Sequence, residues 1–268
     1  MMRSTRPAPI PRRQRLFTPI FDPSRYPAPL LSRVAGRWQQ LYVDEQDAVI
    51  SASLVTTDLA RLGAPAAILA LAARVIEDNV RHVEVCARVL DSLGVAPRTP
   101  APETTRSTLG RGEAIDARCA RALITGFTVA EPLAAAGFAA ARSLAREPLV
   151  AWGFSELLRD EARHGAFGAK AGGWVIRDWT SADRQALWPD CVAKMEAVER
   201  RLGGPLPRAA NGNARGVRPA DRDAEALGMI APEVSCDAVV SAIPRWVLPH
   251  LHALGILPQP IARPAFVH

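Results

Sequence analysis

Apolar residues recur at helical spacing over most of this chain, with polar residues between them, and the pattern predicts an all-α fold. The boundaries follow the usual punctuation of helices. Gly63-Ala64-Pro65 ends the first helix, Pro148 fits the opening turn of the fourth, and Gly203-Gly204 ends the fifth. Ser181 or Asp183 is expected to cap that fifth helix. The sequence therefore predicts helices over about 34–62, 66–93, 113–145, 148–179, 181–203 and 236–254.

These helices suggest three regions. Residues 1–33 are rich in Pro and Arg, cannot form a long helix, and are expected to make an extended or disordered arm. Residues 34–180 hold four long helices, and long helices in sequence favour an antiparallel up-down bundle, with 94–112 crossing its end. Residues 181–268 add C-terminal helices, interrupted by a Gly/Pro-rich loop over 204–232.

Composition supports one well-cored helical domain. The 268 residues are 49% hydrophobic and only 6% aromatic, and Ala and Leu, which favour helices, make up much of the apolar share. The net charge of +6 raises the question of nucleic acid. However, only the first fifteen residues are densely basic, and a basic tail broken by prolines is usually a solvated arm. We therefore expect no nucleic-acid partner.

Other patterns indicate a cytoplasmic protein. No stretch has the ~18–20 uninterrupted apolar residues expected of a membrane helix, so no membrane partner is expected. The N-terminus lacks the apolar core of a secretion signal. The cysteines form no CxxC pair, which argues against a zinc site or a disulfide framework. These four residues are Cys86, Cys119, Cys191 and Cys236.

The chemistry lies in an internal repeat. Asp78–His82 reads Asp-Asn-Val-Arg-His in the second predicted helix, and Asp160–His164 reads Asp-Glu-Ala-Arg-His in the fourth. Positions i and i+3 share a helix face, so Glu161 and His164 can bind one metal ion from a single turn. The Asp and Arg of each motif are expected to form inter-helix pairs, because a metal-bound histidine commonly donates its other N–H to a carboxylate.

Each motif follows a glutamate on the preceding helix. Glu45 stands 34 residues before Asn79, and Glu131 stands 30 residues before Glu161. Glu131 lies in an otherwise apolar run, where an unpaired carboxylate would be costly to bury and a cation is its natural partner. Pro132 follows it and is expected to kink the third helix.

The chain thereby resembles the ferritin-like di-iron superfamily over about residues 35–180. The segments that carry the resemblance are Trp38 to Glu45, Gly63-Ala64-Pro65, Asp78 to Cys86, Gly126 to Glu131, and Asp160 to His164. The resemblance implies a ferritin-like antiparallel four-helix bundle that holds iron, as two ions or one, with manganese as the alternative metal. The implied metal ligands are Glu45, His82, Glu131, Glu161 and His164.

Asn79 departs from the family pattern, which has a bridging glutamate at this position. An amide oxygen is a neutral and weaker ligand, and the resemblance gives Asn79 the role of weak ligand or of donor to bound oxygen. Neither Asp78 nor Glu84 replaces the missing glutamate, because both lie off that helix face. Three hypotheses remain open: an asymmetric di-iron site, a single-metal site built mainly from Glu131, Glu161 and His164, or a bundle that has lost its metal.

The resemblance implies an oxidoreductase that activates O2 and oxidises a small or carrier-bound substrate, with specialised metabolism as one setting. Long connections around a rigid scaffold are typical of a substrate site. An external electron donor is implied, because the chain carries no GxGxxG fingerprint for a nicotinamide or flavin. The alternatives are a metal-deficient ferritin-like scaffold or partner protein, and a simple ferroxidase or iron-binding protein. The apolar, Arg-edged helices are also compatible with a homodimer.

Overall fold

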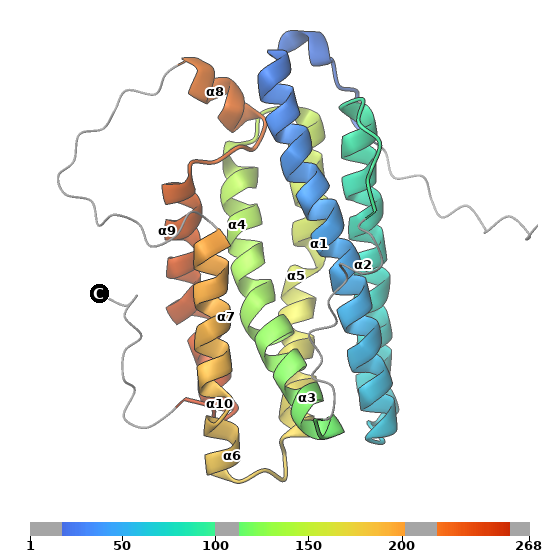
Figure 1. Ribbon diagram of the computed structural model, residues 1–268, viewed down its shortest axis with the longest axis vertical. Helices are drawn as coiled ribbons and strands as arrows, with labels where there is room; N and C mark the ends of the chain where they lie inside the picture. Colours follow the sequence, from blue (N-terminus) through green and yellow to red (C-terminus); the bar gives the residue numbers. More distant parts are fainter. Residues whose placement is uncertain (1–17, 100–112, 202–218, 258–268) are drawn as a thin grey trace, which may run out of the picture.

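The computed structural model describes residues 18–99, 113–201 and 219–257, and these residues are helical with no strand among them (Figure 1). The predicted all-α class is therefore confirmed. A short 3₁₀ turn, η1 (Pro23–Arg25), precedes α1. The long elements are α1 (Ala28–Arg61), α2 (Ala66–Ser92), α3 (Ile115–Ala122), the π-helix η3 (Leu123–Ala130), α4 (Glu131–Leu144) and α5 (Pro148–Val175). The C-terminal elements are α6 (Ser181–Gln185), α7 (Trp188–Arg201), α8 (Pro219–Ala226), α9 (Pro232–Ala242), the π-helix η4 (Ile243–Val247) and α10 (Leu248–Ala253).

The long helices run side by side along the longest axis of the molecule (Figure 1). α1 packs along α2, α2 along α5, and α5 along both η3 and α4. The elements α3, η3 and α4 follow one another without a break, so they form one long rod. The C-terminal helices cover the α4 side, where α7 contacts η3 and α9 contacts α4.

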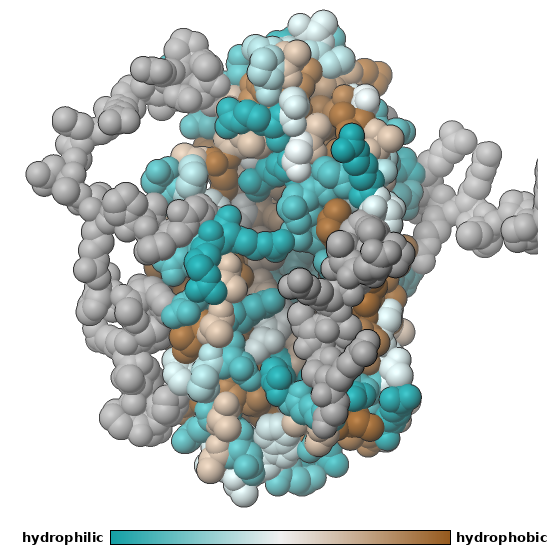
Figure 2. Space-filling model, viewed as in Figure 1, coloured by the Kyte–Doolittle hydropathy of each residue, from teal (hydrophilic) through white to brown (hydrophobic). Residues whose placement is uncertain are grey.

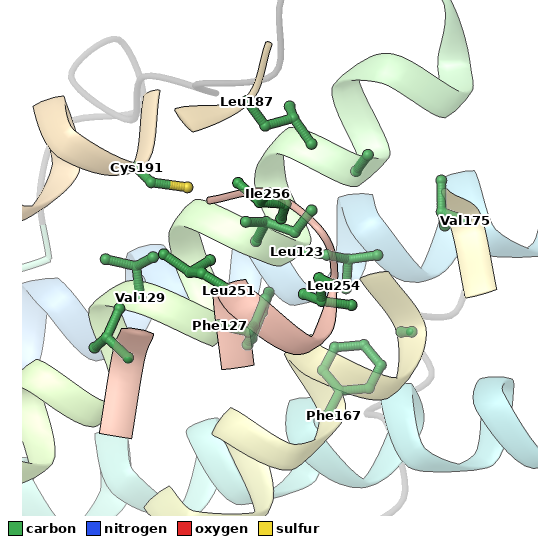
Figure 3. Close-up of a cluster of buried hydrophobic side chains, with 14 of the residues drawn as sticks. Leu123, Phe127, Val129, Phe167, Val175, Leu187, Cys191, Leu251, Leu254 and Ile256 are labelled. Atoms are coloured by element: carbon green, nitrogen blue, oxygen red, sulfur yellow. The ribbon is translucent and has the colours of Figure 1, made fainter. Parts of the chain in front are cut away.

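Two apolar clusters occupy opposite ends of these helices. One contains Leu59, Val75, Phe127 and Phe167 and extends to α10, and Figure 3 shows its side chains pointing toward one another. The other contains Trp38, Val89, Phe138, Phe154 and Leu157. Burial of such side chains contributes about 1.5–3 kcal/mol each, so the two clusters hold the helices in register.

Between the clusters the same helices carry buried polar side chains. Polar and charged residues of α1, α2 and α5 are among the most buried in the described chain, although polar burial normally requires a partner. They are Glu45, Asp78, Asn79, His82, Asp160, Glu161 and His164. A polar layer therefore crosses the molecule at mid-height.

Several predicted boundaries are wrong. The first helix begins at Ala28 and not at about 34, because Pro27 and Pro29 suit a helix start, where no backbone N–H is needed. The N-terminal arm is correspondingly shorter, and its residues 1–17 lie outside the described residues, as do 100–112 of the predicted connection. The fourth helix ends at Val175 and not near 179.

The C-terminal region also differs from its prediction. Thr180 caps α6, in a capping box with Asp183, so neither predicted cap residue holds that position. The predicted fifth helix is broken into α6 and α7. The predicted loop over 204–232 contains α8, whose Leu227 neighbour is buried in the apolar cluster around Trp38. Part of that loop, 202–218, lies outside the described residues.

The rod formed by α3, η3 and α4 corrects the expectation about membrane helices. Over Ile115–Leu144 it is long and apolar enough to cross a membrane by length and composition, with a hydropathy of 1.4 in its most apolar window. The core helix of a folded bundle passes the same test. Here Leu123, Ile124 and Leu133 of the rod are fully buried in the apolar cluster.

Candidate metal centre

Three of the predicted ligands converge in the polar layer. Glu131 comes from the first residue of α4, and Glu161 and His164 come from one turn of α5. Each offers one ligand atom, and these atoms all lie within 4.8 Å of one another. His164 Nδ1 lies 3.7 Å from Glu161 Oε2 and 3.9 Å from Glu131 Oε2. Two carboxylates and an imidazole at such separations form a donor set that suits a divalent transition metal.

The other two predicted ligands adjoin this cluster through Glu161. His82 Nδ1 on α2 lies 3.2 Å from Glu45 Oε2 on α1 and 3.9 Å from Glu161 Oε1. The Glu161 carboxylate thus lies between the two imidazoles, whose ring centroids are 5.6 Å apart. Glu45 and His82 are brought to the site, but they do not join the three-residue group whose ligand atoms all converge.

Asn79 lies in the same polar layer, and the contacts of its side chain do not indicate a role. Its side chain is 1% exposed, and its Nδ2 has no hydrogen-bond partner within the described part of the chain. A buried amide without a partner is costly. The position that would hold a bridging glutamate in the ferritin-like pattern is therefore buried, polar and unsatisfied.

The Asp and Arg residues of the two motifs brace the histidines crosswise. His82 Nε2 lies 3.6 Å from Asp160 Oδ2, and Arg81 forms an ion pair with the same carboxylate. In the other half, His164 Nε2 lies 3.7 Å from Asp78 Oδ2. Each histidine therefore faces the aspartate of the opposite motif, and the predicted inter-helix pairs are confirmed.

Arg163 completes this bracing, because it forms ion pairs with Asp78 and with Asp160, the latter at 3.3 Å. The arginines hold the aspartates, and the aspartates lie beside the Nε2 atoms. This arrangement leaves each Nδ1 facing glutamates, which is how outer carboxylates orient metal-binding histidines.

Two atoms that face the centre make no hydrogen bond to the described residues. They are Glu161 Oε2 and His164 Nδ1, and both are buried. The Nε2 atoms of both histidines, beside the outer aspartates, are also buried without a hydrogen bond. Buried polar atoms are nearly always satisfied, so unpaired atoms that point at one another fit a missing ion. The residues present therefore fit a divalent metal.

The pKa values of the residues at the centre also favour a bound cation. Burial, together with the charges of Glu131 and Glu45, raises the pKa of Glu161 well above its usual value. Burial opposes a charged His164, yet Asp78 and Glu131 raise its pKa to about 9. Asp160 and Glu45 likewise raise the pKa of His82 against the effect of burial. These raised pKa values reflect the repulsion among the clustered carboxylates, and a bound cation would relieve the same repulsion and compete with the protons.

The π-helix η3 delivers Glu131 to the site. The Glu131 N–H donates to the Gly126 carbonyl, five residues back, so the wide turn ends where α4 begins. Pro132 was expected to kink this helix, and the irregularity instead precedes it. Single π-turns occur frequently at functional sites, because the extra residue shifts the side chains that follow.

Gly168 allows α5 to pack closely against the π-helix η3. A Cβ placed on Gly168 would lie 2.6 Å from Phe127 Cβ and 2.7 Å from the Thr128 backbone nitrogen. α5 can therefore approach η3 closely only because residue 168 has no side chain. The close approach brings Glu131 of one rod beside Glu161 of the other.

A cavity of about 590 Å³ reaches the centre from the side. It is bounded by α1, the η3–α4 rod, α7 and α9, and Glu45, Glu131 and Glu161 form part of its wall. Hydrophilic surface runs from the end of α7 across to α1 on this face (Figure 2). There Arg201 of α7 pairs with Asp44 of α1 at 2.8 Å.

The sequence did not point to the cations of this cavity. Arg37 and Lys194 both line it. Lys194 is one of only two lysines in the chain, and that rarity was the one signal available. Their convergence depends on how α7 packs against the rod, which no local pattern shows.

No family model, curated protein or solved structure matches this chain.

Proposed function

We propose that this chain is a ferritin-like oxidoreductase that binds iron between its long helices and uses O2 to oxidise a small molecule held in the adjoining cavity. The carrying observation is the convergence of Glu131, Glu161 and His164, whose ligand atoms lie within 4.8 Å of one another. The position of an aspartate beside Nε2 of each histidine supports it, because metal-binding histidines are commonly oriented by a carboxylate in this way.

The ferritin-like bundle is part of this proposal. In that arrangement two helices each give a glutamate, and the other two each give a Glu-x-x-His pair. Here α1 and α4 carry Glu45 and Glu131, while α2 and α5 carry Asn79 with His82 and Glu161 with His164. The packing of α1 on α2, α2 on α5 and α5 on α4 is consistent with the same bundle.

In the proposed site the two halves have different roles. Glu131, Glu161 and His164 would hold one iron ion firmly, and Glu45 with His82 would form a second, weaker position. Iron bound there would supply the redox chemistry toward O2. Glu161 has a raised pKa and lies between both imidazoles, so it can hold a proton whenever the site lacks cations. Asn79 can offer an amide group to a ligand in the same layer.

The surroundings of the centre favour oxidation of a substrate over iron storage. The two apolar clusters close the layer from above and below, and the cavity opens it at one side. Its volume lies within the range of pockets that take small organic ligands. We accordingly propose a small molecule, or the acyl part of a carrier-bound one, as substrate, with electrons from an external donor in the cytoplasm.

The test is metal loading of the full chain. Metal-free protein is incubated anaerobically with ferrous iron, and iron per chain is measured by mass spectrometry after desalting. We expect about one tightly held iron per chain, and O2 uptake once air and a chemical reductant are added. Iron at background level, with the helical circular dichroism intact, would leave a metal-free scaffold. Many irons per chain would identify an iron store.

A further inference from the structure

One half of the cavity has a mixed wall in which apolar residues and a cation meet. Toward the start of α1 the wall includes Arg37, and the polar Gln40 and Asp44 of α1 also line it. Arg37 precedes Glu45 by eight residues on α1, which corresponds to about 12 Å along a helix. The apolar residues of this part of the wall are Leu41, Ala134, Gly137 and Phe138.

The three cations that line the cavity differ in their partners. Arg201 pairs with Asp44 at 2.8 Å. Burial and the charge of Arg201 lower the pKa of Lys194, whereas Glu131 and Asp44 act in the opposite direction. Both of these cations therefore have carboxylates nearby.

Arg37 has none. Among the described residues it makes no ion pair, and its Nε is buried without a hydrogen-bond partner. Its contact is with an aromatic ring, because its guanidinium carbon lies 5.6 Å from the centre of the Phe154 ring. Burial alone lowers the pKa of Arg37.

Arg37 is half-buried, and a partly buried guanidinium without a counter-ion is unfavourable, since arginine remains protonated in proteins. The ring of Phe154 offsets only part of that cost. A planar guanidinium beside apolar side chains is, however, well suited to receive a carboxylate through two N–H donors. The geometry thus favours a ligand that has one anionic group and an apolar body.

We propose that the cavity binds a small amphipathic monocarboxylate, with its carboxylate on Arg37 and its apolar chain directed along α1 toward Glu45 and Glu131. The opposite orientation would place the carboxylate beside Glu45, Glu131 and Glu161, where like charges repel it. The proposal deepens the proposed function, because the apolar chain of the ligand then lies next to the centre that would oxidise it.

The experiment is calorimetric titration of the full, metal-free chain with decanoate, decanol and decylamine. These probes share one alkyl chain and carry an anionic, a neutral and a cationic head. We expect saturable binding of decanoate, with decanol weaker by tenfold or more and decylamine without binding. Equal binding of decanoate and decanol would overturn the proposal, because it would show a purely apolar pocket.

Two variants locate the anion site. Arg37→Met keeps an unbranched, flexible stem but removes the charged guanidinium, and it should abolish the preference for decanoate, while the melting temperature of the ligand-free protein stays the same or rises. Arg61→Met is the matched control, since Arg61 is an exposed arginine at the other end of α1 and should leave binding unchanged. Loss of decanoate binding in Lys194→Met, but not in Arg37→Met, would overturn the assignment to Arg37.

The same samples separate this inference from the proposed function. Iron loading with no decanoate binding would reject the monocarboxylate site alone. Decanoate binding that depends on Arg37, in a chain that takes up no iron, would reject the oxidoreductase and leave a carboxylate-binding protein.

Discussion

The two halves of the centre carry similar motifs, yet they differ in how many ligand side chains they bring together. In the α4–α5 half, Glu131, Glu161 and His164 converge within 4.8 Å. In the α1–α2 half, Glu45 and His82 are paired at 3.2 Å, and the third position is Asn79. Both histidines are fully buried and both face an aspartate of the opposite motif. The outer bracing has therefore kept its symmetry, while the inner set of ligands has not.

The difference shows what a single carboxylate does in such a layer. Glu161 presents one oxygen to each imidazole, whereas its counterpart in the repeat presents a neutral amide with an unpaired Nδ2. A carboxylate attracts a cation and also balances its charge. A neutral amide attracts a cation only weakly and balances none of its charge. The α4–α5 half is thus expected to bind metal first and more tightly.

The largest effect is expected from Glu161→Ala. Because Glu161 contacts both histidines, its removal should reduce iron to background while the helical circular dichroism persists. Glu84→Ala is the matched control, since that glutamate is half-exposed and pairs with Arg88 away from the centre. Iron content measured by mass spectrometry should be unchanged in the control. Normal iron content in Glu161→Ala would place the metal site elsewhere.

Asn79→Glu should sharpen the comparison by restoring the symmetry. The added carboxylate would complete the α1–α2 half, and iron per chain should rise from about one to about two. Asn79→Ala removes the amide without adding a charge and should leave the count unaltered. If the glutamate variant also shows no rise, position 79 does not face the metal.

The comparison of the two halves also shows how much of the candidate site could be predicted from the sequence. Helical periodicity in the repeat was sufficient to predict that Glu161 and His164 share one helix face. Their meeting with Glu131 was implied by the family resemblance and not by the repeat itself. The repeat also predicted inter-helix pairs for the Asp and Arg residues. The exchange between motifs, in which Arg163 holds Asp78 and Arg81 holds Asp160, required the packing of α2 on α5.

Other features had no local signal. The π-helix before Glu131 packs closely against Gly168 of α5, and a single glycine inside a helix does not indicate such a contact in the sequence. The cavity depends on α7 and α9, whose positions no motif indicated. The early start of α1 has no clear signal in the sequence, because prolines usually end a helix and are favourable only in its first turn.

Removal of the bracing arginines should affect the halves unequally. Arg163→Met frees Asp78 beside His164, and metal affinity should fall by about 10–100-fold, as for other outer partners of metal ligands. Arg81→Met leaves Asp160, beside His82 in the weaker half, with Arg163 as a remaining partner and should cost less. Iron affinities from competition with a chelator would measure both. Equal losses would indicate that the two histidines bind the same ion.

The smallest effect is expected from a change in backbone packing, which also differs between the two halves. Glu45 lies in a regular α-helix, whereas Glu131 follows the π-helix η3. Gly168→Ala would force a Cβ against the backbone of η3, and the free energy of unfolding should fall by about 1–3 kcal/mol. Gly36→Ala is the matched control on α1, where an added Cβ meets nothing within 4 Å and helix propensity should stabilise by up to about 1 kcal/mol. Urea unfolding of the metal-free proteins measures both changes.

If Gly168→Ala also weakens iron binding while Gly36→Ala does not, the close approach of α5 to η3 is what sets the position of Glu131. A destabilised variant with normal iron affinity would show instead that the π-turn only accommodates packing.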